Sequence, residues 1–374
     1  MTHKLCPILC RLPGEEGNPG DVFIAIGLQE VLDQALGKNS QPLPWLKLSK
    51  FKPGHVKTHI GLIKEAGFII IGGMPQYNNY DDWCFWYDRE FWQEFIVPNN
   101  IKVFPLAGGS GYPSNTMTPQ EFSAHCLRSN ETKRVLGIRC DHSSFFTVRD
   151  EHSYALLKDF DRTPEVHHLA CTATFAAKAR GIEWESEGRL IIVPPSPGSI
   201  PTQYLIENTH GMTPEAINKI KSEKIMRLFI ACGKALEEEY DSKPVYMAHY
   251  FPEYLLMKQY GIPEDQIFFT NDYYRILKMY STADYVFSAR LHGALPPFGM
   301  CGPTVVHVGI DTRMGAVDYF DKIPNLKIQE LTPEAAVNAM EKAKPWTDQE
   351  FHQELWHNQV LFYRDRIRRE GFFQ

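Results

Sequence analysis

The chain has 374 residues, more than one hydrophobic core usually serves, so its length predicts two domains. Its hydrophobic content of 43% and charged content of 22% are those of an ordinary globular protein. The formal net charge of −6 excludes a chain-wide basic surface for nucleic acid, although a local cationic pocket stays compatible with it. No nucleic-acid partner is expected.

The eight cysteines form no CxxC pair, and no histidine cluster has the spacing of a zinc site. We interpret them as buried thiols in a reducing compartment. The first residues lack the apolar core of a signal peptide, and no run reaches the ~18 apolar residues of a membrane span. These features predict a cytoplasmic protein with no metal and no cofactor. The oligomeric state is not readable.

The first half of the chain alternates strand and helix patterns. Residues 22–36 have helical periodicity, and residues 118–127 open with Thr-Pro, which is typical of a helix start. Three short apolar runs read as buried strands that end at loops: 66–73, 101–109 and 143–150. Buried strands alternating with helices favour a parallel sheet covered on both faces. We assign residues 1–175 to this N-terminal α/β domain.

The second half repeats the alternation, and we assign residues 176–345 to a C-terminal α/β domain. Its expected strands are 188–195, 243–250, 265–270, 283–290 and 303–309. Its expected helices are 213–240, 271–281 and 332–343. The predicted fold class is therefore α/β, with two Rossmann-like domains facing a cleft. Ligands in such sheets bind beyond the carboxyl ends of the strands.

The last segment, residues 346–374, is predicted to hold one long amphipathic helix with arginines near its C-terminus, where the helix dipole favours cations. Two interpretations stay open. The helix packs back across the domain interface onto the N-terminal domain, or it lies on the inner face of a membrane.

The stretch "SARLHGA" begins within the expected strand at 283–290 and carries the strongest chemical signal. Arg290 would stand at the carboxyl end of that strand, and the next residues would begin a helix whose free N–H groups suit an anion. A guanidinium can hold a carboxylate or phosphate through two contacts, and His292 can donate to a phosphate or move a proton. The alternative is a structural salt bridge beside a core histidine.

Neighbouring strands are expected to bring further polar groups to the same sheet edge. Arg313 follows the strand at 303–309, and His249 and Glu253 follow the strand at 243–250. A second arginine suits a doubly charged ligand, while a histidine and a carboxylate could share acid and base work. Ordinary loop polarity is the competing interpretation of all three.

The N-terminal half offers candidates for binding a sugar. Asn18 and Asp21 lie in a glycine-rich turn, where Asp21 could instead cap a helix. Gly73 ends a strand and leaves room for a ligand. Residues 76–95 combine aromatic rings with Asp and Asn, which suits the apolar face and the hydroxyls of a carbohydrate. The rings could also simply fill a core. The aromatic candidates are Tyr80, Trp83 and Trp86.

Several of these stretches together resemble the polysaccharide pyruvyltransferase family. "SARLHGALPPFGMCGPTVVHVG" is similar to its Arg-Leu-His signature, "VRDEHSYALL" to its Arg-Asp-x-x-Ser stretch, and "GNPGDVFIAIGL" to its N-terminal Asn-x-Gly-Asp segment. The resemblance spans about residues 17–310. Two positions depart from it: Cys171 stands where many members have Asp, and Arg313 where lysine is common.

The resemblance implies a GT-B-type fold, phosphoenolpyruvate as the donor and a hydroxyl pair of a sugar or lipid-linked glycan as the acceptor. It suggests Arg290 and His292 as donor-binding residues and places Arg149 near the cleft. With the chemistry of ketal formation added, the expected site residues fall into three groups. The donor group is Arg290, Leu291, His292, Gly293 and Arg313; the acceptor group is Asn18, Asp21, Gly73, Tyr80, Trp83, Trp86 and Arg149; the acid and base candidates are His292, His249, Glu253 and Asp21.

Two other functions stay open at this point. A nucleotide-sugar glycosyltransferase of the same fold would also use basic residues in the C-terminal domain, but it needs a pocket for a base and a ribose. A non-catalytic glycan-binding protein would keep the aromatic stretch and have no use for Arg290 and His292.

Overall fold

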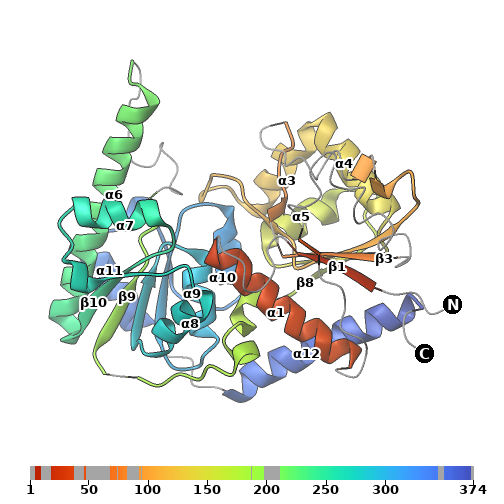
Figure 1. The fold of residues 1–374 in the computed structure, drawn as a ribbon. Coiled ribbons are helices and arrows are strands. Elements are labelled where there is room, and N and C mark those ends of the chain that lie inside the picture. The colour runs from red at the N-terminus through yellow and green to blue at the C-terminus, as the bar shows by residue number, and fades with distance from the viewer. Residues whose placement is uncertain are drawn as a thin grey trace.

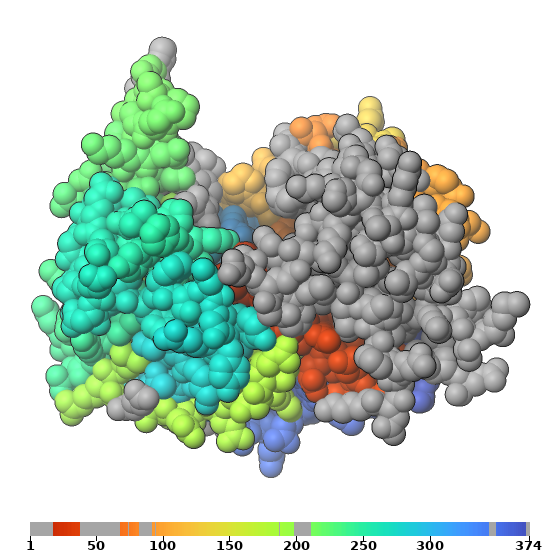
Figure 2. All heavy atoms as spheres, in the orientation of Figure 1, coloured from red at the N-terminus to blue at the C-terminus, as the bar shows by residue number. Residues whose placement is uncertain are grey.

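The computed structural model describes residues 5–9, 18–37, 46–47, 68–73, 75–81, 92–93, 95–186, 188–197, 211–343 and 349–371. The chain forms two α/β units that lie side by side, with the long helices α1 (Pro19–Leu36) and α12 (Gln349–Arg369) running along their junction (Figure 1). The space-filling view shows the same two bodies, with the first turns of α6 (Pro214–Tyr240) projecting from the C-terminal one (Figure 2).

The C-terminal unit is built on a six-stranded sheet in which all pairs are parallel. Its spatial order is β11-β10-β9-β12-β13-β14. This is the 3-2-1-4-5-6 order of a doubly wound sheet, and its topological switch point lies between β9 and β12. The strands are β9 (Leu190–Val193), β10 (Lys243–Ala248), β11 (Ile267–Phe269), β12 (Tyr285–Ser288), β13 (Thr304–Gly309) and β14 (Asn325–Lys327).

The N-terminal unit has a parallel sheet in the order β2-β1-β3-β5. Beyond β5 the ladder continues, because the Gly108 N–H donates to the Thr147 carbonyl (3.1 Å) and the Arg149 N–H donates to the Gly108 carbonyl (2.9 Å). Two short strands, β4 and β6, pair separately. The strands are β1 (Leu5–Leu9), β2 (Leu46–Lys47), β3 (Phe68–Gly72), β4 (Pro75–Tyr77), β5 (Lys102–Leu106), β6 (Gly109–Ser110), β7 (Phe145–Val148) and β8 (Glu165–His168).

Helices cover both sheets, and several of them begin at the Thr-Pro pairs that the sequence indicates as helix starts. Thr118 caps α3 with a capping box, and Thr213 and Thr332 cap α6 and α11 ahead of a proline. The remaining α-helices are α4 (Asn130–Asp141), α5 (Glu151–Asp159), α7 (Phe251–Gln259), α8 (Tyr273–Ser281), α9 (Leu291–Phe298) and α10 (Gly315–Asp318), with α3 at Pro119–Arg128 and α11 at Pro333–Lys342.

Helix α1 begins three residues earlier than the periodicity predicts. Asn18 is its N-cap, and the Asn18 Oδ1 accepts a hydrogen bond from the Gly20 N–H at 3.1 Å. Pro19 then occupies the first helical position, where its missing N–H costs nothing. Asp21 as the N-cap is therefore wrong: it lies in the first turn.

Helix α12 packs back onto the N-terminal unit, as the fold prediction expected. Tyr363 and Ile367 are fully buried in one cluster with Phe104 and Phe145 of the N-terminal sheet. The Tyr363 hydroxyl lies 3.1 Å from the Thr147 hydroxyl. The apolar side of α12 is thus covered by protein. In the described part of the chain, no helix is long and apolar enough to span a membrane.

The two units also contact each other directly. Asn115 exchanges two hydrogen bonds with Gln329, at 2.7 and 2.8 Å, and donates to the Gly309 carbonyl at 2.7 Å. Tyr112 and Thr312 bond through both backbone and hydroxyl groups. These contacts fix the cleft between the sheets. The predicted boundaries at residues 175 and 345 stay predictions.

Candidate functional site

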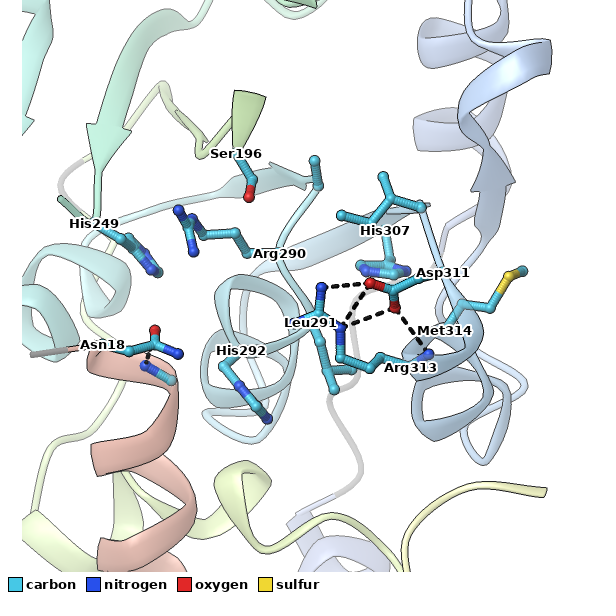
Figure 3. A pocket seen from close by; sticks show the side chains of 13 residues that line it. Asn18, Ser196, His249, Arg290, Leu291, His292, His307, Asp311, Arg313 and Met314 are labelled. Atoms are coloured by element: carbon cyan, nitrogen blue, oxygen red, sulfur yellow. Dashed lines mark hydrogen bonds and ion pairs between the residues drawn. The ribbon is translucent and has the colours of Figure 1, made fainter. Parts of the chain in front are cut away.

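A cavity lies at the carboxyl ends of the C-terminal strands, at the switch point between β9 and β12. The first turn of α1, which belongs to the N-terminal unit, closes one side of it (Figure 3). A topological switch point is where open α/β sheets bind ligands. The lining residues are Asn18, Gly20, Ser196, His249, Ala289, Arg290, Leu291, His292, His307, Ile310, Asp311, Arg313 and Met314.

Two helix N-termini meet at this cavity. Arg290 is the N-cap of α9 and its side chain makes no capping hydrogen bond, so the first N–H groups of α9 point toward the cavity without a side-chain cap. Helix α1 presents its N-terminus from the opposite unit. Both ends carry a partial positive charge, which favours an anionic ligand.

Arg290 is held by a buried carboxylate. Its Nη2 pairs with Glu253 Oε1, and the two side chains are only 11% and 8% exposed. The other Glu253 oxygen accepts the backbone N–H of His249 at 2.9 Å, so Glu253 is itself anchored in the first turn of α7. The Tyr250 ring lies 5.0 Å from the guanidinium carbon of Arg290. The Arg290 Nε is buried and has no hydrogen-bond partner among the residues that the structure describes.

Arg313 also pairs with a buried carboxylate, that of Asp311, and both residues follow strand β13. Its Nε lies 2.9 and 2.8 Å from the two oxygens of Asp311, and its Nη2 contacts the second of them. Asp311 is 5% exposed and also accepts the Arg313 backbone N–H at 2.9 Å. The nearby Asp311 carboxylate, acting mainly through its charge, raises the pKa of Arg313. The arginine is thus charged and aimed along the cavity wall.

His292 joins the two units. Its Nε2 lies 3.4 Å from Arg149 Nη1 and 3.9 Å from the Cys171 sulfur, both in the N-terminal half of the chain. On its other side the ring presses against α1, where a Cβ on Gly20 would come within 2.5 Å of Nδ1. Only glycine fits at that position of α1.

His292 and His249 are both neutral at neutral pH. Burial, reinforced by Arg149, Arg313, His249 and Arg290, lowers the pKa of His292 well below its usual value. Burial followed by the charge of Arg290 does the same to the pKa of His249, whose Nε2 lies 3.3 Å from the Tyr280 hydroxyl. The positive charge of the site therefore resides on the arginines.

The sequence of the chain matches the model of a known protein family. The model described as polysaccharide pyruvyl transferase matches residues 18–311, which is more than half of the chain. The chain belongs to the polysaccharide pyruvyl transferase family. The resemblance inferred from the Arg-Leu-His stretch is confirmed. No curated protein matches the chain.

Solved structures confirm the GT-B fold of this pyruvyl transferase family member. The MnaA–UDP co-structure from S. aureus aligns with a TM-score of 0.51 at 12% identity, covering 98% of this chain and 94% of that one. A putative UDP-N-acetylglucosamine 2-epimerase from Listeria monocytogenes aligns with a TM-score of 0.51 at 12% identity, covering 100% and 98%. At this identity the likeness establishes the fold alone.

Most of the predicted donor residues of this family member meet at the cavity. Arg290, Leu291, His292 and Arg313 line it, as do His249 and Asn18. Gly293 lies one step behind, where a Cβ would come within 2.4 Å of the Ser288 hydroxyl. The roles of these residues stay predictions.

The predicted acceptor residues are dispersed. Tyr80 is 3% exposed, and its ring lies 5.5 Å from the guanidinium carbon of Arg139 within the N-terminal unit. Gly73 adopts a φ of 68° and packs against Ile24 of α1. Neither is among the cavity residues. Trp83 and Trp86 lie outside the described residues.

Three polar side chains that line the cavity were not predicted: Asp311, Ser196 and His307. Asp311 directly precedes the Thr-Arg pair at a strand end, so the Asp-x-Arg spacing was an available signal. Ser196 lies in the proline-rich loop after β9. His307 sits inside an apolar strand, where a core position was the natural expectation; burial lowers its pKa to about 4. Within the described residues, no cluster of His, Cys, Asp or Glu could hold a metal ion.

Proposed function

We propose that this protein transfers the pyruvyl group of phosphoenolpyruvate to two hydroxyls of a sugar, forming a cyclic ketal and releasing phosphate. One observation carries the proposal. In a chain of the pyruvyl transferase family, Arg290 and Arg313 line a single cavity at which the N-termini of α1 and α9 converge. Phosphoenolpyruvate is a small ligand with a carboxylate and a phosphate. It can therefore use two bidentate cations and a helix end together.

The carboxylate partners of the two arginines shape the expected affinity. Glu253 and Asp311 each offset part of an arginine's charge, and Glu253 occupies one edge of Arg290. The donor then binds the remaining N–H groups of the guanidinium. Because the arginine charges are partly offset, we expect a moderate affinity for the donor and a release of phosphate that is not prevented by tight binding.

In the proposed reaction the central carbon of the donor becomes cationic twice. A proton adds to the methylene carbon of the donor, which becomes the methyl group, and the central carbon becomes electrophilic. The first sugar hydroxyl attacks that carbon and gives its proton to a base. The carbon–oxygen bond to phosphate then breaks, phosphate leaves, and the second hydroxyl attacks and loses its proton. The net reaction converts donor and diol to ketal and phosphate, with no cofactor.

The available groups narrow the choice of base. Both oxygens of Glu253 are engaged by Arg290 and the His249 N–H, and His249 is 3% exposed. Asp21 is only partly buried in the first turn of α1 and is close enough to Arg313 and Tyr250 to influence the pKa values of both. We assign Asp21 as the base that takes the hydroxyl proton, which places the acceptor sugar between α1 and the donor.

Calorimetry with two ligands tests the proposal. Phosphoenolpyruvate is titrated into the wild-type protein and into Arg313→Gln, with UDP as the competing titrant. We expect phosphoenolpyruvate to bind the wild type and to bind the variant at least tenfold more weakly, because one anionic group loses its charged partner. Binding of UDP but not of phosphoenolpyruvate would instead support a nucleotide-sugar glycosyltransferase. A protein that binds neither of these ligands but does bind a glycan would be a non-catalytic glycan-binding protein.

A further inference from the structure

The two nitrogens of the His292 ring have different surroundings. Nε2 points toward the N-terminal half of the chain, to Arg149 Nη1 at 3.4 Å and the Cys171 sulfur at 3.9 Å. Nδ1 points toward the first turn of α1, beside Gly20. Gly20 and His292 both line the cavity, and Nδ1 is the ring nitrogen on the Gly20 side.

The neighbours of Nε2 can give hydrogens to it. An arginine guanidinium has five N–H donors, no acceptor and a permanent proton, so Nη1 of Arg149 can only donate. Burial raises the pKa of the Cys171 thiol, which therefore keeps its hydrogen and is a weak donor as well. A second proton at Nε2 would face both of these donors. Nε2 is therefore the lone-pair nitrogen, and the ring proton belongs on Nδ1.

Arg149 is rigid enough to impose this choice. It is 1% exposed at the end of β7, and its backbone N–H is bonded to the Gly108 carbonyl at 2.9 Å. The next residue, Asp150, caps α5 and accepts the backbone N–H groups of Ser110 and Ser153, each at 2.8 Å. Both sides of Arg149 are thus tied into secondary structure.

We infer that Arg149 and Cys171 are positioning residues that hold His292 as the neutral tautomer with its proton on Nδ1. His292 then donates a hydrogen bond into the cavity and does not act as a proton-transferring acid through Nε2. The assignment of the tautomer does not depend on the proposed function. Only the recipient of the hydrogen bond, an oxygen of the bound phosphoenolpyruvate, rests on the proposed function.

The other groups that face the ring agree with a neutral state. Burial of the ring is the largest effect that lowers the pKa of His292, and Arg149, Arg313 and Arg290 add to it, so all of these oppose a second proton on the ring. His249, which follows β10, is itself neutral. From α1 the charged group is Asp21, next to Gly20. Glu253 and Asp311 offset part of the charge of Arg290 and Arg313, and burial of the ring is the largest effect that keeps it neutral.

A substitution at position 171 can change the protonation state of the His292 ring. The Cys171 sulfur lies between Arg149 Nη1 and His292 Nε2, 3.9 Å from each. The oxygens of an aspartate reach one bond further from the backbone than a cysteine sulfur, so a carboxylate here would come close enough to accept a hydrogen bond from each. It would favour a proton on Nε2 and hence the imidazolium. Cys171→Asp is therefore the informative substitution, and Cys171→Ser, a neutral side chain of similar size, is its matched control.

The experiment is a two-bond ¹H–¹⁵N correlation spectrum of the full-length protein labelled at histidine, with His292 assigned by its absence in His292→Gln. We expect the wild type and Cys171→Ser to show a neutral ring protonated at Nδ1 that does not titrate between about pH 5.5 and pH 8. In Cys171→Asp the ring should acquire its second proton within that range. Addition of phosphoenolpyruvate to the wild type should shift the Nδ1–H resonance.

The outcomes separate the inference from the proposed function. A wild-type ring protonated at Nε2, or one that titrates near its usual pKa of about 6.5, would overturn the inference even if Cys171→Asp fails to fold. A ring with the expected tautomer in a protein that does not bind phosphoenolpyruvate would leave the inference standing and refute only the proposed function. An unchanged ring in Cys171→Asp would show that Cys171 does not set the state of His292.

Discussion

Replacing Glu253 by glutamine should have opposite effects on the empty protein and on donor binding. The amide would keep the size of the side chain and one oxygen, but it would lose the charge that compensates Arg290. The pair is nearly buried, at 8% and 11% exposure, so the arginine would be left with little solvent to replace the carboxylate. We expect the empty variant to be less stable and its affinity for phosphoenolpyruvate to be higher.

The magnitude follows from the burial of the pair. Removing one partner of a buried ion pair costs about 3–5 kcal/mol. The Tyr250 ring, 5.0 Å from the guanidinium carbon, and the residual exposure of Arg290 favour the lower end, about 3 kcal/mol. The donor's anionic group would supply the missing charge, and a gain of about 1.4 kcal/mol corresponds to tenfold tighter binding.

Urea unfolding with and without saturating phosphoenolpyruvate, together with calorimetry, measures both effects. The control is Glu264→Gln, which removes an exposed carboxylate bonded to Tyr254 and Lys258 and should leave stability and donor affinity unchanged. A Glu253→Gln variant as stable as the wild type would refute the buried-pair reasoning. Weaker donor binding in that variant would show that Glu253 chiefly orients Arg290.

Three further outcomes follow from the structure. Gly20→Ala should reduce turnover at least tenfold with little change in fold by circular dichroism, because the new Cβ would meet His292 Nδ1 at 2.5 Å; full activity would contradict the close packing of α1 on the site. Burial lowers the pKa of His352 to about 4 from 6.5, so the unfolded chain binds the proton first as pH falls, and about 3 kcal/mol of stability should be lost between pH 6.5 and 4. Urea unfolding of His352→Gln over that range should show a shallower pH dependence, and an equal slope would refute the assignment. Tyr363→Phe removes the contact with the Thr147 hydroxyl and should lower the free energy of unfolding by about 1 kcal/mol, whereas no change would mean that the hydroxyl pair does not help hold α12.

The sequence was sufficient for five of the six strands of the C-terminal sheet, because these are apolar runs that end at polar loops; the short edge strand β14 was not predicted. Val286 and Phe287 of β12 and Val305 and Val306 of β13 are all buried, as expected for parallel strands covered on both faces. Strand β1 was not predicted, since Pro7 interrupts a short run in which proline is unfavourable for a central strand. Helix α4 was missed because its sequence, NETKRVLGIRCD, is largely polar.

Site residues could be predicted where their position after a strand places them at the cavity. Contacts between side chains that are far apart in the sequence could not be predicted. Arg290 could be placed because a residue that follows a buried parallel strand must lie at the ligand-binding edge. Its partner Glu253 is 37 residues away, and the Arg149–His292 contact joins residues 143 apart. The first pair depends on how loops of one sheet lie side by side, and the second on how the two units dock, and no local pattern encodes either. The ring of Tyr80, a predicted sugar ligand, packs beside Arg139, and its role in binding stays a prediction.

The central claim is that carbon from phosphoenolpyruvate becomes part of a sugar, and mass spectrometry tests it most directly. The protein is incubated with uniformly ¹³C-labelled phosphoenolpyruvate and a panel of oligosaccharides with free 4,6- or 3,4-hydroxyl pairs, in parallel with UDP-sugars. We predict that one sugar gains the mass of a labelled pyruvate ketal while an equal amount of phosphate is released. Intact phosphoenolpyruvate together with transfer from a UDP-sugar would contradict the account and make the protein a glycosyltransferase.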